Sequence, residues 1–79
     1  MVTYKYFKTV ADMIHYHYKT NGMGNDGEFA ISIDGKRVKF IKNADFDEAR
    51  NHVCHALNKI ATSLRNGEPI PLEGTIAWY

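Results

Sequence analysis

Three side chains able to bind metals or act as nucleophiles lie within four residues of one another, at His52, Cys54 and His55. On a helix, residues three apart lie on the same side, so His52 and His55 could bind one ion, while Cys54 points roughly 100° away from His55. A zinc site needs further ligands, and the sequence has no CxxC or HExxH spacing. We therefore predict no metal and no cofactor, and keep a metal-dependent enzyme that uses His52 and His55 as an alternative.

The other reactive side chains do not form a catalytic arrangement. Cys54 and His55 are neighbours in sequence, but the side chains of adjacent helical residues diverge. Neither of the two serines lies in a GxSxG elbow. The carboxylates Asp45, Asp47 and Glu48 coincide with the expected start of a helix, where acidic side chains cap the first turn and interact favourably with the helix dipole. We expect this protein not to be an enzyme.

A glycine-rich segment, residues 22–27, reads Gly-Met-Gly-Asn-Asp-Gly and matches the GxGxxG pattern of dinucleotide-binding loops. That pattern binds a pyrophosphate only where it follows a strand and begins a helix. Here a helix is expected before the segment and a strand after it, and Asp26 would repel a phosphate. The sequence therefore predicts a flexible connection.

The strongest local charge lies between Lys36 and Lys42, where four cations and no acid occur in seven residues. The cations are Lys36, Arg37, Lys39 and Lys42, and Lys5 would join them if the first strand lies alongside. Cations beside aromatic rings are typical of nucleic-acid binders, but a net charge of +1 is small for that class. Cations also keep an edge hairpin soluble. We take these five residues as candidate partner-binding residues.

The C-terminal segment is a second candidate surface. It contains two prolines, at positions 69 and 71, followed by Ile76, Trp78 and Tyr79. Aromatic side chains are frequent anchors of protein interfaces. Trp78 and Tyr79 either dock on the protein's own sheet or contact a partner, so both are candidate partner-binding residues.

Two segments carry helical patterns that could position these side chains. Residues 10–19 place Val10, Met13, Ile14, His17 and Tyr18 on one side at 100° per residue, which predicts an amphipathic helix with His17 in the core or at an interface. Residues 46–65 carry a longer apolar stripe after an N-cap at Asp45, and Gly67 is the expected terminator. The members of this stripe are Phe46, Ala49, Val53, Ala56, Leu57, Ile60 and Leu64.

A hairpin is expected between the two helices. Asp34-Gly35 is a residue pair preferred by two-residue type I′ turns, in which both central residues have φ > 0. Such a turn pairs Ile31 with Val38 and Phe29 with Phe40, so that apolar side chains meet across the strands on one face. Arg37 and Lys39 then project from the other face.

Both ends of the chain are expected to form strands, over residues 2–7 and 75–79, because apolar and polar residues alternate in the first and β-formers dominate the second. The predicted fold is a single α+β domain over residues 1–79. It has an antiparallel sheet of three to four strands with two helices on one face. The order β-α-β-β-α-β is that of ferredoxin-like proteins.

Composition limits the function further. The chain has 79 residues, 44% of them hydrophobic and 24% charged, with one cysteine, which excludes an internal disulfide and fits a reducing compartment. No apolar run approaches the roughly 18 residues that cross a bilayer, so we expect a soluble, cytoplasmic protein. A domain of this size has a small core, and a homodimer would add buried area.

We therefore expect a small non-enzymatic protein-binding module. An inhibitor that occupies a surface of a larger protein, like those that phages direct against host enzymes, has this economy of size. A nucleic-acid-binding protein that uses Lys5, Arg37, Lys39 and Lys42 is the first alternative, and the metal-dependent enzyme is the second.

Overall fold

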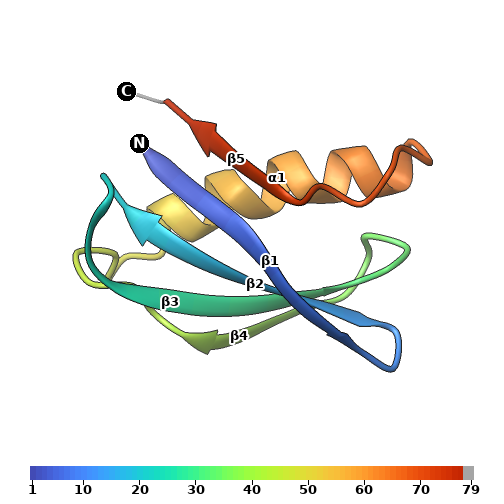
Figure 1. Cartoon of the computed structure of the whole chain (residues 1–79), viewed down its shortest axis with the longest axis horizontal. Helices are drawn as coiled ribbons and strands as arrows, with labels where there is room; N and C mark the ends of the chain where they lie inside the picture. Colours follow the sequence, from blue (N-terminus) through green and yellow to red (C-terminus); the bar gives the residue numbers. More distant parts are fainter. Residues whose placement is uncertain (78–79) are drawn as a thin grey trace.

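The structure, a computed structural model, describes residues 1–77, which form one antiparallel sheet of five strands and one α-helix. The strand order across the sheet is β4-β3-β2-β1-β5, so β4 and β5 are its two edges (Figure 1). In chain order the elements are β1 (Val2–Val10), β2 (Met13–Thr20), β3 (Met23–Ser32), β4 (Val38–Lys42), α1 (Asn51–Arg65) and β5 (Glu73–Ile76).

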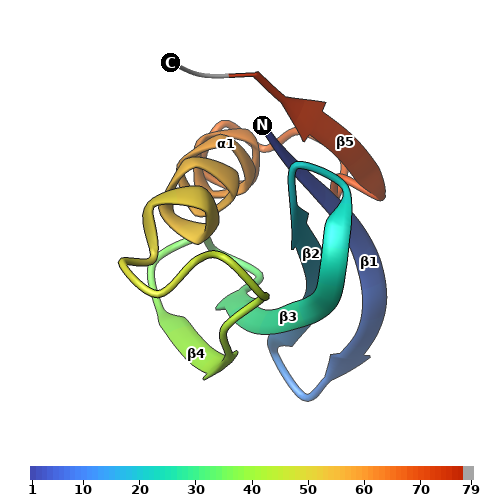
Figure 2. The same ribbon diagram turned by 90° about the vertical axis from the view of Figure 1, so that its left-hand side faces the viewer.

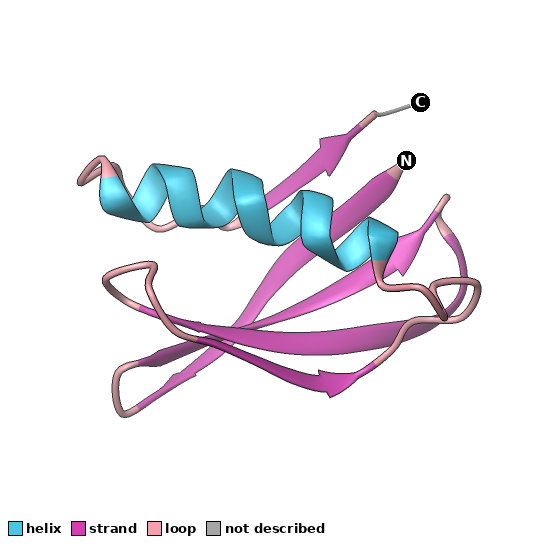
Figure 3. Ribbon diagram, turned by 180° about the vertical axis from the view of Figure 1, so that it is seen from behind, coloured by secondary structure: helices cyan, strands magenta, loops and turns pink. Residues whose placement is uncertain are grey.

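The sheet is strongly curved, and α1 lies along its concave face (Figures 2 and 3). Strands β1 to β4 form a meander, in which each strand pairs with the next. After α1 the chain returns to the opposite edge, where β5 pairs antiparallel with β1. The order is therefore β-β-β-β-α-β, and the predicted ferredoxin-like arrangement with two helices is wrong.

The error lies in residues 10–19, which form the end of β1, a turn and most of β2 rather than a helix. Ile14, Tyr16, Tyr18 and Thr20 are each at most 2% exposed, whereas the residues between them lie on the opposite face. This alternation has the period of two that a half-buried strand requires. Aromatic and β-branched side chains also favour a strand.

The glycine-rich segment is a tight turn followed by the first half of β3, and not a flexible connection. Asn21 and Gly22 have φ of 52° and 70°. Two consecutive positive φ values are what a type I′ hairpin turn needs, and Asn-Gly is its preferred pair. His17 consequently lies on the outer, convex face of the sheet and not in the core.

The cross-strand pairs predicted for the hairpin around Asp34-Gly35, now β3 and β4, are confirmed, since Phe29 pairs with Phe40 and Ile31 with Val38. The turn differs from the predicted one. The connection spans residues 33–37, and within it Gly35 alone has a positive φ, of 76°. The Ser32 N–H donates to the Arg37 carbonyl oxygen at 2.9 Å, which closes the loop.

Helix α1 begins at Asn51, five residues later than predicted, and Phe46 is 61% exposed. The cap comes from Asp47 instead of Asp45: the Asp47 carboxylate accepts the backbone N–H groups of His52 at 2.8 Å and Val53 at 3.1 Å. At the other end Gly67 terminates the helix with φ 72°, as predicted. The members of the apolar stripe from Val53 onward are confirmed as buried; they are Val53, Ala56, Leu57, Ile60 and Leu64.

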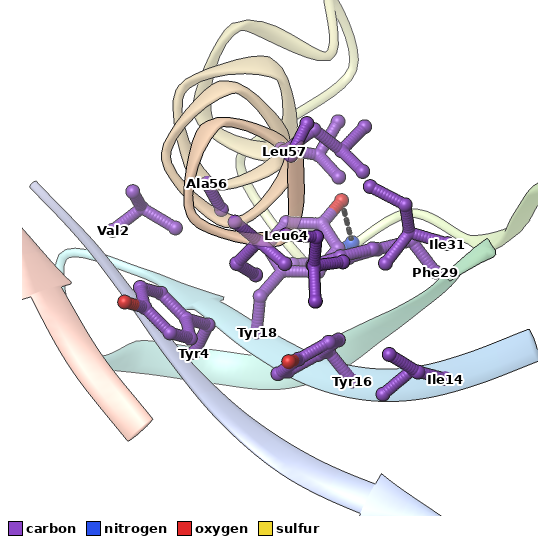
Figure 4. Close-up of a cluster of buried hydrophobic side chains, with 14 residues drawn as sticks. Val2, Tyr4, Ile14, Tyr16, Tyr18, Phe29, Ile31, Ala56, Leu57 and Leu64 are labelled. Carbon is purple, nitrogen blue, oxygen red and sulfur yellow. Dashed lines mark hydrogen bonds between the residues drawn. The ribbon is translucent and has the colours of Figure 1, made fainter. Parts of the chain in front are cut away.

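The core lies between α1 and the concave face (Figure 4). Its centre is aromatic: Tyr16 stacks on Phe29 with ring centroids 5.4 Å apart and meets Tyr4 edge to face at 6.0 Å. The hydroxyl groups of Tyr16 and Tyr18 have partners, whereas the buried Thr20 hydroxyl has no hydrogen-bond partner among the described residues. Tyr16 donates to the Pro71 carbonyl oxygen at 2.7 Å, and Tyr18 accepts from the Ala44 N–H at 3.0 Å.

The strands predicted at the two ends are present in β1 and β5, with different bounds. Strand β1 extends to Val10, and β5 begins at Glu73. Trp78 and Tyr79, which the sequence marks as candidate binding residues, lie outside the described residues. Within residues 1–77, the helix α1 is too short and too polar to cross a membrane.

Candidate functional site

Strand β4 forms an open edge of the sheet. It pairs with β3 on one side, and in residues 1–77 no strand pairs with its other side. All five of its residues are exposed. An unpaired strand presents a row of backbone N–H and C=O groups that a further strand can bind. We therefore treat β4 and the surfaces that adjoin it as the candidate site.

On the inner side of β4, a shallow apolar groove of about 190 Å³ separates this strand from α1. Val38 and Phe40 form one wall, and they remain 44% and 40% exposed because α1 packs mainly over the strands beyond them. Residues of α1 form the other wall, and Gly35 also lines the groove. The helix residues of this wall are Cys54, Leu57, Asn58, Ala61 and Arg65.

An arginine stands at each end of the groove. The Arg50 guanidinium carbon lies 4.6 Å from the centroid of the Phe40 ring, a cation–π geometry. At the other end, Arg65 Nε donates to the Gly35 carbonyl oxygen at 3.2 Å.

The backbone before α1 contains two residues with positive φ. Arg50 has a φ of 60°, and Phe46 one of 68°. Bulky residues adopt this region rarely and at a cost of about 1–3 kcal/mol, so the bonds around Asp47 must hold the segment in place.

The outer side of β4 carries Lys39 and Lys42, and the exposed Ile41 lies between them in sequence. Lys39 is opposite Ala30, and Lys42 is opposite Glu28. Lys36 and Arg37 lie in the preceding loop, where Arg37 forms an exposed ion pair with Asp12 of the β1–β2 turn. Four of the candidate residues therefore lie along one edge, in the order Lys36, Arg37, Lys39, Lys42.

Lys5 is not part of this group. It lies on β1, and strands β2 and β3 separate it from β4. Its cross-strand partners are His17 on one side and Glu73 on the other. The sheet therefore places Lys5 about 14 Å from Lys42 at the usual strand spacing.

A second polar cluster occupies the middle of the outer face. His15 Nδ1 lies 2.9 Å from a Glu28 carboxylate oxygen, and His17 Nε2 lies 3.7 Å from the other. The Phe7 ring stacks on His17 with centroids 4.2 Å apart. Among the described residues, no group of three or more His, Cys, Asp and Glu side chains is placed to hold a metal ion. The cluster is a network of hydrogen bonds and ion pairs across β2 and β3.

The structure also places His52 of α1 beside Asp47. His52 Nδ1 is 3.3 Å from the Asp47 carboxylate, which already accepts two backbone N–H groups of the helix. Cys54 is exposed and lines the groove. The structure therefore does not bring His52 and Cys54 to a common centre.

The sequence indicated the cations of this site and missed its apolar half. The sequence predicts that Val38 and Phe40 face Ile31 and Phe29, but it does not predict that the two side chains stay exposed. Arg50, Arg65 and the groove wall of α1 were not identified. The two lysines of Val38–Lys42, at positions 39 and 42, are a signal typical of edge strands that could have identified the site.

Comparison of the chain with protein-family models, with curated proteins and with solved structures found no match.

Proposed function

We propose that this protein is a small non-enzymatic binding module that occupies a surface of another protein through its β4 edge. The observation that supports the proposal is the composition of that edge: an unpaired strand with an apolar groove on one side and lysines on the other. Interfaces commonly combine an apolar centre with a charged rim. Because the lone cysteine is exposed, we place this activity in a reducing compartment such as the cytoplasm.

Site-specific crosslinking tests the proposal. A photoreactive amino acid replaces Lys39 in one variant and Lys59, an exposed residue of α1, in the matched control. In a lysate of the cells that express the protein, we expect the Lys39 variant to capture one defined protein and the Lys59 variant to capture much less. Equal capture from both positions, or none from Lys39, would contradict the proposal.

Charge reversal gives the quantitative form of the test. Lys39→Glu should weaken binding of the captured protein, while the melting temperature changes by no more than about 4 °C, because Lys39 lies opposite Ala30 and surface substitutions stay within about 0.5 kcal/mol. Lys59→Glu is the control for charge. Unchanged affinity would place the interface elsewhere on the molecule.

The nucleic-acid alternative makes a different prediction. A protein that neutralises several phosphates loses affinity steeply as the salt concentration rises. In a filter-binding titration with single-stranded and double-stranded oligonucleotides, we expect no retention even at low salt. Sub-micromolar binding with a steep salt dependence would favour the alternative.

A further inference from the structure

The net charge of the chain is only +1, but the charges are unevenly distributed. Residues 36–42 contain four cations and no acid. Most carboxylates near the sheet have partners: Asp12 pairs with Arg37, Asp26 with Lys19, and Glu28 with His15. Five cations on or beside β4 and at the ends of α1 form no ion pair with any carboxylate in residues 1–77, and the same holds for Lys5, Lys8 and Lys59 elsewhere. The five are Lys36, Lys39, Lys42, Arg50 and Arg65.

Of the acids near these cations in sequence, Asp34 and Asp47 are engaged by other groups, and the exposed Glu48 and Glu68 form no ion pair with Arg50 or Arg65. Asp34 accepts the Ser32 hydroxyl and the Lys36 N–H, and these bonds hold the pKa of its carboxyl below its usual value. Asp47 is buried and caps α1. The positive charge of the edge is therefore left for an external partner.

From this combination we infer that the β4 edge binds an extended, acidic segment of a partner protein as an additional strand. Backbone groups of the segment would pair with the free side of β4. Alternate side chains of an added strand point to opposite faces, so apolar residues would enter the groove beside Phe40 while acidic residues would face Lys39 and Lys42. Such strand addition takes affinity from the backbone and specificity from the alternate side chains. The inference rests on the proposed function, because it names the kind of partner.

Charge favours this occupant over a second copy of the chain. Strand β4 has five residues, which corresponds to an edge of about 17 Å and to a segment of similar length. Two copies of β4 side by side would place the four cations of residues 36–42 against the same four cations, with no acid between them. Like charges directly opposite each other destabilise a strand pair.

The probe is a phage-displayed library of random octapeptides, selected on the full chain. We expect the enriched peptides to alternate apolar residues with Asp or Glu. The best peptide, synthesised, should lose about tenfold or more in affinity toward the Lys39→Glu, Lys42→Glu variant. It should lose at least as much when alternate backbone nitrogens are methylated, since methylation removes the donors that pair with β4. Lys59→Glu should leave its affinity unchanged.

Two measurements locate the bound peptide. The amide resonances of residues 38–42 should shift and become protected from hydrogen exchange. Because Cys54 lines the groove, its reaction with iodoacetamide should slow in the presence of the peptide. Peptides without acidic enrichment, a library that yields no binder, or binding that survives methylation would each overturn the inference.

The same experiments separate the inference from the proposed function. If Lys39 crosslinks a partner but no acidic strand binds, the module binds through this surface in another way. Sedimentation of the free chain should give a monomer. A dimer with protected β4 amides would show that a second copy is the occupant, and would overturn the inference as well.

Discussion

Helix α1 is tied to the sheet at both of its ends, and each tie is a tyrosine hydroxyl from β2. Tyr18 fixes the connection from β4 into α1, where it accepts the Ala44 N–H and donates to Asp47 at 3.1 Å. Tyr16 fixes the connection from α1 to β5 through one bond to the Pro71 carbonyl oxygen. The first tie joins a buried carboxylate to the helix N-terminus, and the second is a single neutral bond. The N-terminal end of the helix is therefore the more strongly held one.

Removal of the Asp47 carboxylate should change the free energy of unfolding most. We expect Asp47→Ala to lower the free energy of unfolding by about 3–4 kcal/mol, because it removes the helix cap and leaves buried donors without partners. Urea denaturation measures this change. Glu48→Ala, one residue along and exposed, is the control and should stay within about 0.5 kcal/mol. Similar losses of unfolding free energy for the two variants would mean that the bonds of Asp47 do not hold this end of α1 to the sheet.

The next largest effect should come from two glycines that make room at the two edges. A methyl group on Gly27 would overlap the Tyr18 ring and the backbone of Ala44 and Lys42. On Gly74 it would meet the hydroxyl end of Tyr4, which lies at the outer limit of the core. We expect Gly27→Ala to cost about 3 kcal/mol and Gly74→Ala about 1 kcal/mol in thermal unfolding. A larger loss for Gly74→Ala than for Gly27→Ala would contradict the tighter packing that the structure shows around Gly27.

Removal of the hydroxyl groups compares the two ties directly. Tyr18→Phe leaves the Ala44 N–H and one Asp47 oxygen without their bond, so we expect a loss of about 2–3 kcal/mol. Tyr16→Phe removes one bond to a carbonyl oxygen and should cost about 1 kcal/mol. Urea denaturation of both variants at pH 7 is the measurement. Equal losses would show that the carboxylate adds nothing to the Tyr18 tie.

The smallest effect should appear only in alkali. Burial raises the pKa of Tyr18 to about 12, and burial together with Tyr4 and Tyr6 raises the pKa of Tyr16 further. An unfolded tyrosine ionises near pH 10, so the unfolded state loses these protons first. These two groups leave stability unchanged well below pH 10 and lower it as the pH rises from about 10 to 12.

The unfolding free energy measured against pH checks this effect. The protein with both tyrosines should lose stability more steeply above pH 10 than the Tyr16→Phe, Tyr18→Phe double variant does. The lysines are the same in both proteins, so their titration cancels in the difference. Parallel curves would mean that neither hydroxyl is held neutral by the fold.

Local signals in the sequence predicted part of this structure. The pairing of Phe29 with Phe40 follows from the alternation on both sides of the Asp34-Gly35 turn, and Gly67 marks the end of α1. The helix predicted for residues 10–19 was wrong because Ile14 and Tyr18 are four residues apart. That spacing fits one side of a helix as well as one face of a strand. The Asn21-Gly22 pair was the signal that distinguishes the two.

Only the part of the candidate site whose residues are close together in the sequence could be predicted. The cations of residues 36–42 are close in sequence, so they stay together in any fold. The groove depends on how α1 lies beside β4, which no local pattern specifies. The same limit applies to Lys5, whose distance from β4 depends on the order of all five strands.

The pairing of β5 with β1 has a consequence for the order of folding. Val2 pairs with Ile76, so the first strand of the sheet acquires its outer neighbour from the end of the described chain. During synthesis, β1 to β4 can form their local hairpins early, while the β1 edge stays uncovered until β5 arrives. Contacts between such distant residues slow folding and prolong the exposure of unpaired strands. The nascent protein thus passes through a stage in which both edges of the sheet are unpaired, and the synthesis of β5 covers one of them.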